Sequence, residues 1–149
     1  MVRLIDTPSP EQVAMALRAL ARDMGDPYRM EDDLLARSLG SCARAVLAEA
    51  AGQTVGVALF SPFVSTTRGR IGAFVTDLWV DGSQRGGGLG RALLARVRDL
   101  VAADWGGSFL RLNHYADNSG AAAFYARLGF HGKPDEIWLT LEGRELAAL

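Results

Sequence analysis

The chain has 149 residues, long enough to form one domain and to bury a hydrophobic core without disulfides or structural metals. Its 49% hydrophobic and 22% charged residues are ordinary for a globular protein, and a formal net charge of −1 argues against nucleic acid or an anionic membrane as the main partner. The length and the absence of a long linker predict a single domain over residues 1–149. One cysteine and two histidines far from any metal-ligand spacing predict no metal site, and the absence of an 18-residue apolar run predicts no membrane span. The single cysteine and the lack of a signal-peptide pattern in the first residues predict a cytoplasmic location.

A short strand and two helices are predicted at the start of the chain. Residues 2–5 have the apolar pattern of the strand. Residues 9–12 read Ser-Pro-Glu-Gln, a capping box with proline in the first turn, and apolar residues follow at helical spacing as far as Met24. A Gly-Asp-Pro sequence at 25–27 ends this helix, and the acidic residues 31–33 begin a second one.

The rest of the chain alternates between strand and helix patterns. The predicted elements are strands over 43–50, 54–60 and 71–80, a helix from Leu89, a strand over 109–115, a helix over 118–128 and a strand over 137–141. Because strands are adjacent in the middle of the chain and alternate with helices later, we predict a mixed sheet in an α/β (α+β) fold.

The most informative stretch is a glycine-rich turn between the strand over 71–80 and the helix that follows. Residues 85–91 read Arg-Gly-Gly-Gly-Leu-Gly-Arg. Backbone N–H groups that converge at a helix N-terminus bind phosphate, and glycine lets the backbone approach it closely. A Walker A loop would need Lys and Ser or Thr after Gly90, and a dinucleotide fingerprint would need a third glycine that is absent. The spacing that fits is Arg85-x-x-Gly88-x-Gly90, and the alternative is a flexible surface loop.

A second motif lies over residues 118–130, which read Asn-Ser-Gly-Ala-Ala-Ala-Phe-Tyr-Ala-Arg-Leu-Gly-Phe. The glycine-rich stretch resembles the acetyl-CoA pyrophosphate loop of the GNAT superfamily of N-acetyltransferases, and this second stretch resembles the other GNAT signature. Independently of the resemblance, a thiolate leaving group needs a proton, and the phenol of Tyr125 on a helix can supply one. The alternative is that Tyr125 belongs to a core stripe with Phe124 and Leu128.

The resemblance implies a fold and a set of binding residues. The fold is a mixed, mostly antiparallel sheet flanked by helices, with a splayed cofactor cleft between the fourth and fifth strands. The backbone N–H of Val80 would stabilise negative charge on the acetyl carbonyl, and Leu78 would pair with pantetheine. The residues that the resemblance implies for acetyl-CoA binding are Leu78, Trp79, Val80, Arg85, Gly86, Gly87, Gly88, Leu89, Gly90, Arg91, Asn118, Ala121 and Tyr125.

A narrower resemblance is to the diamine acetyltransferases, the spermidine/spermine type and its thialysine-like relatives. The stretches that carry it are residues 19–21, 31–35, 65–72, 77–80 and 138–143. Two positions depart from familiar patterns. Thr76 replaces the glutamate usual in that branch, and Asn113 stands where ribosomal-protein acetyltransferases place one. Both familiar candidates for a carboxylate base are therefore missing.

The remaining polar residues bear on an amine acceptor and its base. Alternation along the strand places Asp77 on the face of Val75 and Trp79, where it binds a cationic substrate, relays a proton through water or is simply a surface acid. His114 is either a base or a structural histidine. The acids at 31–33 either form the rim of an amine pocket or are ordinary helix N-terminal acids. The residues predicted to contact the acceptor are Tyr28, Glu31, Asp33 and Asp77.

These patterns predict an acetyl-CoA-dependent N-acetyltransferase that acts on a small primary amine, polyamine-like or lysine-like, by direct attack in a ternary complex. The catalytic residues are predicted to be Tyr125, Val80 and Asp77. The alternatives are an acetyltransferase for protein N-termini or amino acids, and a non-catalytic acyl-CoA-binding regulatory module. Cys42 has no partner in a catalytic motif and is expected to be a small buried residue. The resemblance also implies a homodimer.

Overall fold

A five-stranded sheet forms the centre of the first part of the chain. The computed structural model describes all 149 residues as two compact units, residues 1–113 and 114–149, each considered by itself. The strands of the first unit are β1 (Val2–Ile5), β2 (Arg44–Ala50), β3 (Gln53–Ser65), β4 (Arg70–Val80) and β5 (Leu110–Leu112), and they lie in that order. Strands β1 to β4 pair antiparallel, and β5 joins β4 in parallel. The predicted mixed, mostly antiparallel sheet is confirmed.

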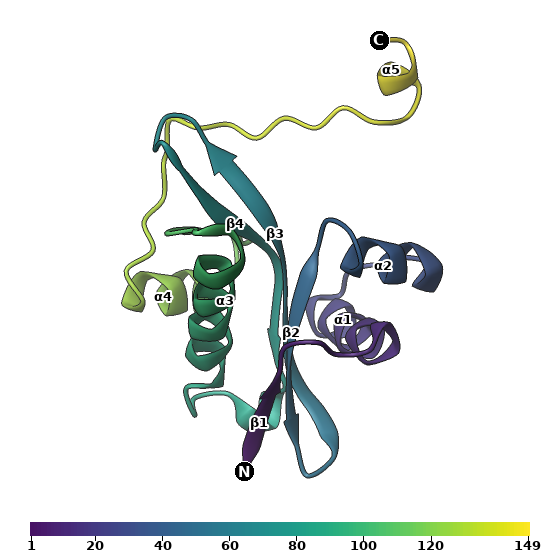
Figure 1. Cartoon of the computed structure of the whole chain (residues 1–149), viewed down its shortest axis with the longest axis vertical. Coiled ribbons are helices and arrows are strands. Elements are labelled where there is room, and N and C mark those ends of the chain that lie inside the picture. Colours follow the sequence, from purple (N-terminus) through teal and green to yellow (C-terminus); the bar gives the residue numbers. More distant parts are fainter. The chain divides into compact units, whose positions relative to one another are not determined.

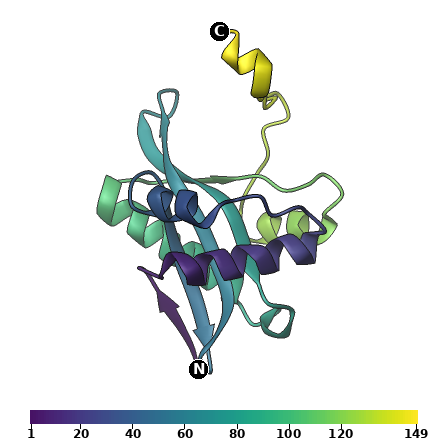
Figure 2. The same cartoon turned by 90° about the vertical axis from the view of Figure 1, so that its right-hand side faces the viewer.

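Helices cover both faces of this sheet. Helices α1 (Pro10–Met24) and α2 (Asp32–Leu39) lie on one face, and α3 (Leu89–Trp105) lies on the other (Figures 1 and 2). A parallel pair of strands needs a crossover connection, and α3 provides it between β4 and β5. A short 3₁₀ helix (Gly82–Gln84) precedes the glycine-rich turn.

The ends of α1 follow from local sequence. The Ser9 hydroxyl accepts a hydrogen bond from the backbone N–H of Gln12, and the Gln12 side chain accepts one from the backbone N–H of Ser9, so the predicted capping box is present. Gly25 ends the helix with a φ of 72°, in the left-handed region that glycine adopts without strain.

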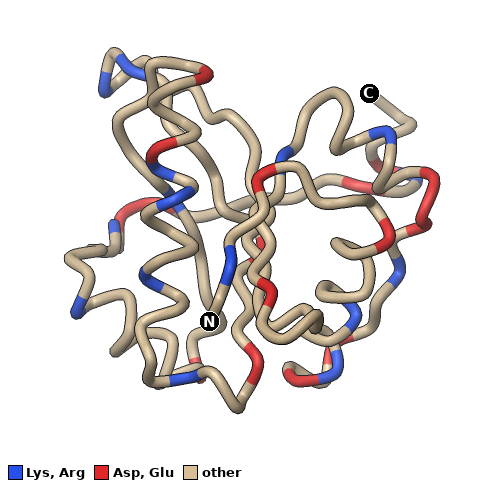
Figure 3. The backbone as a smooth tube through the Cα atoms, turned by 60° about the horizontal axis from the view of Figure 1, so that its bottom comes forward, with Lys and Arg blue, Asp and Glu red and all other residues tan.

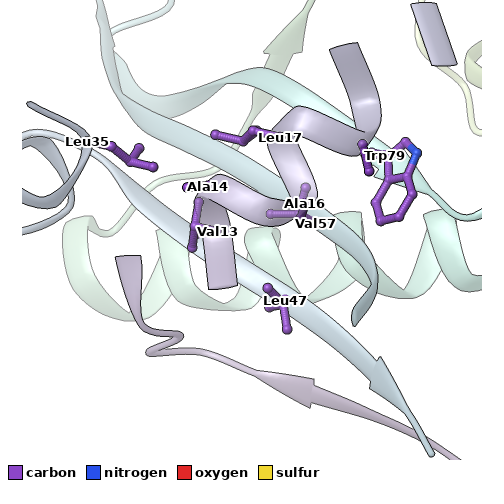
Figure 4. Close-up of a cluster of buried hydrophobic side chains, with 10 residues drawn as sticks. Val13, Ala14, Ala16, Leu17, Leu35, Leu47, Val57 and Trp79 are labelled. Carbon is purple, nitrogen blue, oxygen red and sulfur yellow. The ribbon is translucent and has the colours of Figure 1, made fainter. Parts of the chain in front are cut away.

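The core on the α1 face consists of aliphatic side chains and one indole (Figure 4). Its largest contributions come from Leu17 on α1, Leu35 on α2, Leu47 and Val57 on the sheet, and Trp79 near the end of β4. Leu35, Leu47 and Val57 are essentially inaccessible to solvent. Burial of each such side chain stabilises the fold by roughly 1.5–3 kcal/mol, so this cluster fixes α1 against β4.

Charged residues of both signs are interspersed along the chain (Figure 3). Two ion pairs tie α3 to other elements of the first unit. Arg96 pairs with Asp6 in the segment before α1, its Nε lying 2.8 Å from the carboxylate, and Asp104 pairs with Arg44 at the start of β2.

The second unit contains α4 (Ser119–Arg127) and the short α5 (Gly143–Ala147). The Leu-Gly-Phe end of the second motif has a local structural function. Gly129 takes a φ of 91°, and the backbone N–H of Phe130 donates to the Tyr125 carbonyl while that of Gly129 donates to Ala126. This is a Schellman cap, and the Phe130 ring packs edge-on against the Tyr125 ring with centroids 5.6 Å apart.

Several expectations were wrong. The strand predicted over 137–141 does not form; these residues pair with no other strand, and Ile137 and Leu139 are more than four-fifths exposed. Strand propensity alone does not satisfy the backbone of a strand, which needs a paired neighbour. Cys42 is exposed in the loop before β2, not buried. The fifth strand is also shorter than the predicted 109–115.

Candidate active site

Strands β4 and β5 separate halfway along β4. Their pairing covers only Ala73 to Val75 of β4, the last pair being Val75 with Leu112, while β4 itself continues to Val80. The separation coincides with a β-bulge, because Leu59 of β3 pairs with Asp77 and Phe60 with Val75, which leaves Thr76 as the extra residue. The expected splay between the fourth and fifth strands is therefore present, and the second half of β4 has an open edge.

The bulge decides which backbone groups face that edge. Before it, the N–H of Ala73 donates to Phe109, toward β5. After it, the N–H of Asp81 donates to Val55 of β3, and the alternation of an antiparallel ladder then turns the N–H and C=O groups of Leu78 and Val80 away from β3. The Val80 carbonyl agrees with this assignment, since it accepts from the side chain of Arg85 and not from β3. Two backbone N–H groups thus point to the open edge.

The glycine-rich turn follows directly. Gly86 and Gly88 have φ angles of 79° and 84°, and a Cβ placed on either would contact nothing within 4 Å. Gly88 is the N-cap of α3 and offers no side chain to the first backbone N–H groups of that helix. Gly87 is likewise exposed, while Gly90 lies within the first turn. The turn is open to a ligand at the positive end of a long helix dipole.

Arg91 adds a positive charge at this helix end. It is exposed and lies in the first turn of α3, where a cation is unfavourable for the helix dipole unless an anion binds. No hydrogen bond or ion pair occupies its guanidinium. The side chain of Leu89, in contrast, is buried beneath α3, so only its backbone can contact a ligand.

Arg85 points back into its own unit. Its Nε donates to the Val80 carbonyl at 2.9 Å, and its Nη2 donates to Oδ2 of Asp23 at 2.8 Å. The same Asp23 oxygen accepts from the indole Nε1 of Trp79 at 2.9 Å. Trp79 was predicted to contact the cofactor, but its side chain is buried in the core on the α1 face. Sequence reasoning missed Asp23, which no local motif marks.

Asp77 lies on the same face of β4 as Trp79, because it pairs with Leu59 and Leu59 packs against the α1-side core. The prediction that Val75 shares this face was wrong. Val75 pairs with Phe60, whose ring contacts Trp105 of α3, so the bulge at Thr76 turns it to the opposite face. Asp77 is half-buried, and this burial raises the pKa of its carboxyl group, while a hydrogen bond with Thr76 opposes the shift.

Tyr28 lies in the connection between α1 and α2 and close to Asp77. Its hydroxyl oxygen is buried without a hydrogen-bond partner. Burial raises the pKa of Tyr28, the charge of Arg18 lowers it, and the charges of Asp32 and Asp77 raise it further. The Arg18 guanidinium lies 5.1 Å from the centre of the Tyr28 ring and pairs with Asp32 at 2.5 Å. A buried hydroxyl that has no hydrogen-bond partner and is influenced by carboxylate charges is suited to a polar ligand.

The predicted acceptor residues Glu31 and Asp33 lie at the start of α2, where both are exposed. Neither forms an ion pair, and neither is among the charges that shift the pKa of Tyr28. Asp32, which the prediction passed over, is the acid of this turn that interacts with the Arg18 and Tyr28 pair. The sequence does not indicate which of these three adjacent acids points toward α1.

The second motif lies in the second unit. Asn118 is the N-cap of α4, and its side-chain oxygen accepts from the backbone N–H of Ala121 at 3.0 Å. Tyr125 is half-buried, and burial raises the pKa of its phenol. Its ring packs against Phe124 and Phe130 and stacks near His114, with centroids 6.1 Å apart. The exposed His114 has its Nδ1 2.7 Å from the carbonyl oxygen of Tyr115.

The open edge and the glycine-rich turn fit one kind of ligand. An extended chain with amide groups can pair with the N–H groups of Leu78 and Val80, and a pyrophosphate can occupy the uncapped helix N-terminus beside Arg91. An acyl-coenzyme A has both parts in this order. The fold and the site together therefore fit an acyl-CoA-dependent transferase.

The chain belongs to the acetyltransferase (GNAT) family, whose sequence model matches residues 12–130. The predictions of this superfamily and of an N-acetyltransferase enzyme are confirmed at that level, and the family uses acetyl-CoA as co-substrate. No curated protein matches the sequence significantly.

Solved structures with similar folds support the architecture. An integron cassette protein from V. cholerae superposes with a TM-score of 0.78 at 20% identity, covering 99% of this chain and 96% of that one. A ribosomal-protein-alanine N-acetyltransferase from Brucella melitensis biovar Abortus 2308 gives 0.73 at 21% identity, with coverages of 95% and 99%. An aminoglycoside acetyltransferase from an uncultured soil metagenomic sample, in complex with sisomicin, gives 0.76 at 15%, with coverages of 95% and 96%.

No helix is long and apolar enough to cross a membrane. No group of three or more His, Cys, Asp or Glu side chains is arranged to hold a metal ion.

Proposed function

We propose that this acetyltransferase transfers the acetyl group of acetyl-CoA to a small primary amine, polyamine-like or lysine-like, by direct attack in a ternary complex. The observation that carries the proposal is the bulge in β4. It presents the N–H groups of Leu78 and Val80 at an open edge, while Asp77, on the same strand, is half-buried on the face of α1. Donor and acceptor can then meet at one strand. The proposal takes residues 1–149 as one functional domain.

Backbone N–H groups and the guanidinium of Arg91 bind acetyl-CoA, the acetyl donor. Bound acetyl-CoA supplies an acetyl group activated as a thioester. The N–H of Leu78 pairs with the pantetheine portion, and the turn over residues 86–90 with Arg91 holds the pyrophosphate. The N–H of Val80 stabilises the negative charge that develops on the acetyl oxygen. Asn118 and Ala121 contribute from the start of α4, as the family resemblance implies.

Asp77 and Tyr28 recognise the acceptor. An ammonium group satisfies both the half-buried carboxylate and the unpartnered hydroxyl, two groups that carry an energetic penalty when left alone. The exposed Glu31 and Asp33 add negative potential at the N-terminus of α2, where they attract a second charged amino group of the acceptor. This arrangement supports a polyamine or a lysine analogue over a neutral acceptor.

The acceptor must lose a proton before it attacks. The usual glutamate positions hold Thr76 and Asn113, so we assign deprotonation to Asp77 acting through water. Tyr125 protonates the departing thiolate, because a phenol carries its proton at neutral pH, and burial, which raises its pKa, keeps it in that form.

The decisive experiment is to incubate the purified chain with acetyl-CoA and a panel of amines while following release of free thiol. We expect turnover with spermidine or a lysine analogue. The panel includes an aminoglycoside and a peptide beginning with alanine, because two structurally similar proteins are named for such acceptors. Exclusive turnover of the peptide would establish the protein N-terminal alternative. Binding of acetyl-CoA with no turnover of any amine would establish the non-catalytic module.

The resemblance further implies a homodimer, and the composition of the sequence predicts a cytoplasmic location; both belong to the proposal. The single exposed cysteine and the absence of disulfides are compatible with a reducing compartment.

A further inference from the structure

A single carboxylate oxygen joins three elements of the first unit. Oδ2 of Asp23, in the last turn of α1, accepts from Nε1 of Trp79 at 2.9 Å and from Nη2 of Arg85 at 2.8 Å. Arg85 also donates from Nε to the Val80 carbonyl at 2.9 Å. The chain of contacts runs from α1 through the side chain of Arg85 to the last peptide of β4.

The geometry of Arg85 explains what this contact can do. A guanidinium is planar and presents its donors in a fixed fork, so one side directed at Asp23 sets the direction of the other. With Nε and Nη2 engaged, Arg85 cannot turn this edge of its guanidinium outward to a phosphate without breaking these hydrogen bonds. Arg91 remains as the free cation of the turn. The Nε and Nη2 edge of Arg85 thus has a function within the protein that differs from binding a phosphate.

We infer that Asp23 is a positioning residue for the donor site. Its charge holds Arg85 on the Val80 carbonyl, which fixes the peptide that leads from β4 into the glycine-rich turn and keeps the Val80 N–H directed to the open edge. A preorganised turn loses less conformational entropy when its ligand binds. This inference rests on the proposed function of the turn as the pyrophosphate site.

A purely structural role for Asp23 would be to satisfy the indole of Trp79. Asp23→Asn distinguishes the two roles, because asparagine still offers an oxygen to Nε1 but removes the charge that attracts Arg85. Arg85→Gln removes the fork itself. If Asp23 acts through Arg85, its replacement has no further effect once Arg85 has been changed.

The test measures binding of coenzyme A by calorimetry to wild type, Asp23→Asn, Arg85→Gln and the double variant. Both ion-pair partners are about half exposed, at 58% and 44%, so we expect roughly two- to fivefold weaker binding in Asp23→Asn. The double variant should bind as Arg85→Gln does. Glu49→Gln is the control, because it removes the Arg3–Glu49 ion pair between β1 and β2 and should leave the affinity unchanged.

A measurement without ligand keeps the inference separate from the proposed function. The Nε–H proton of Arg85, followed by NMR, should exchange slowly in wild type and faster in Asp23→Asn. Unchanged exchange, or additive losses of affinity in the double variant, would overturn the positioning role. A wild-type chain that does not bind coenzyme A would refute the proposed function and the donor-site role with it, whereas faster exchange in the variant would still show that Asp23 holds Arg85.

Discussion

At the scale of single residues, Gly88 has a backbone conformation that favours glycine, and the space around its Cα is free of other protein atoms. Its φ of 84° lies in the left-handed region, and no atom lies within 4 Å of the position that a Cβ would take. Any other residue there is strained by roughly 1–2 kcal/mol but meets no steric clash with the protein. A side chain at this position would instead occupy the space in which phosphate approaches the backbone.

We therefore expect Gly88→Val to keep the fold and to lose most of its affinity for acetyl-CoA, as measured by calorimetry. Gly106→Val is the matched control. Gly106 ends the same helix with a φ of 62° and equally open surroundings, so it brings similar strain without touching the turn. Equal affinities of the two variants would remove the pyrophosphate assignment.

In the proposed mechanism, the protonation of Asp77 links activity to pH. Because burial raises its pKa in the folded protein, the folded state binds more protons than the unfolded state between the two pKa values, and stability falls as pH rises through that window. Asp77→Asn should therefore melt at a higher temperature than wild type at neutral pH, and the difference should vanish at acid pH. In wild type, kcat/KM should rise with pH as the carboxylate forms.

For the same variant we expect kcat/KM with a cationic amine to fall about 10²-fold at neutral pH, the lower end of the range for a general base. The rise of activity with pH that Asp77 causes should also be lost. A variant that gains stability and keeps full activity would show that Asp77 is not part of the acceptor site.

A conservative substitution at Tyr125 tests the proposed general acid. Tyr125→Phe retains the packing of the ring against Phe124 and Phe130 and removes only the acid. If the phenol protonates the leaving thiolate, kcat should fall by on the order of 10²–10⁴-fold while acetyl-CoA affinity changes little. Steady-state rates must be accompanied by a test that chemistry limits turnover. Rates within about twofold of wild type would assign Tyr125 to the Schellman cap alone.

At the scale of elements, the approach of β5 to β4 depends on glycine. A Cβ on Gly72 would lie 2.4 Å from the carbonyl oxygen of Phe109 and 2.6 Å from its ring. The two strands are close here, before they separate at Thr76. Gly72 consequently determines where β5 can lie relative to the open half of β4.

Gly72→Ala should destabilise the protein by about 1–3 kcal/mol or more, because backbone must move to relieve the contact, and thermal unfolding would report the loss. Gly82→Ala is the control, since Gly82 has open surroundings and no positive φ. Similar melting temperatures for both variants would contradict the close packing of β4 on β5.

At the scale of the whole molecule, the chain leaves a group of apolar side chains uncovered near its end. Ile137, Leu139 and Leu149 are more than four-fifths exposed, and Trp138 and Leu146 are more than half exposed. Where such side chains form a contiguous patch, the patch is typical of a surface used in association. They are consistent with the homodimer that the resemblance implies.

Sedimentation equilibrium should then give twice the mass of the chain. Leu139→Glu should shift the protein toward a monomer, because a charge cannot be buried unpaired in such an interface. A wild-type monomer at micromolar concentration would remove the homodimer from the proposal.

Most of the correct predictions rest on short sequence motifs. The capping box at Ser9, the glycine spacing from Arg85 to Gly90 and the Leu-Gly-Phe ending of α4 each act over a few residues. Helix ends, the position of the glycine-rich turn and the family could therefore be predicted from the sequence. The strand over 137–141 could not be predicted in the same way, because pairing depends on a partner far away in the chain.

Which groups face the site depends on how the strands and helices pack against each other. The bulge at Thr76 reversed the face of Val75 and turned Leu78 and Val80 to the open edge, which simple alternation along β4 does not anticipate. The contact of Asp23 with Arg85 joins residues 62 positions apart in sequence. Ladder register and long-range ion pairs arise when elements pack against each other, and no local pattern of residue types encodes them.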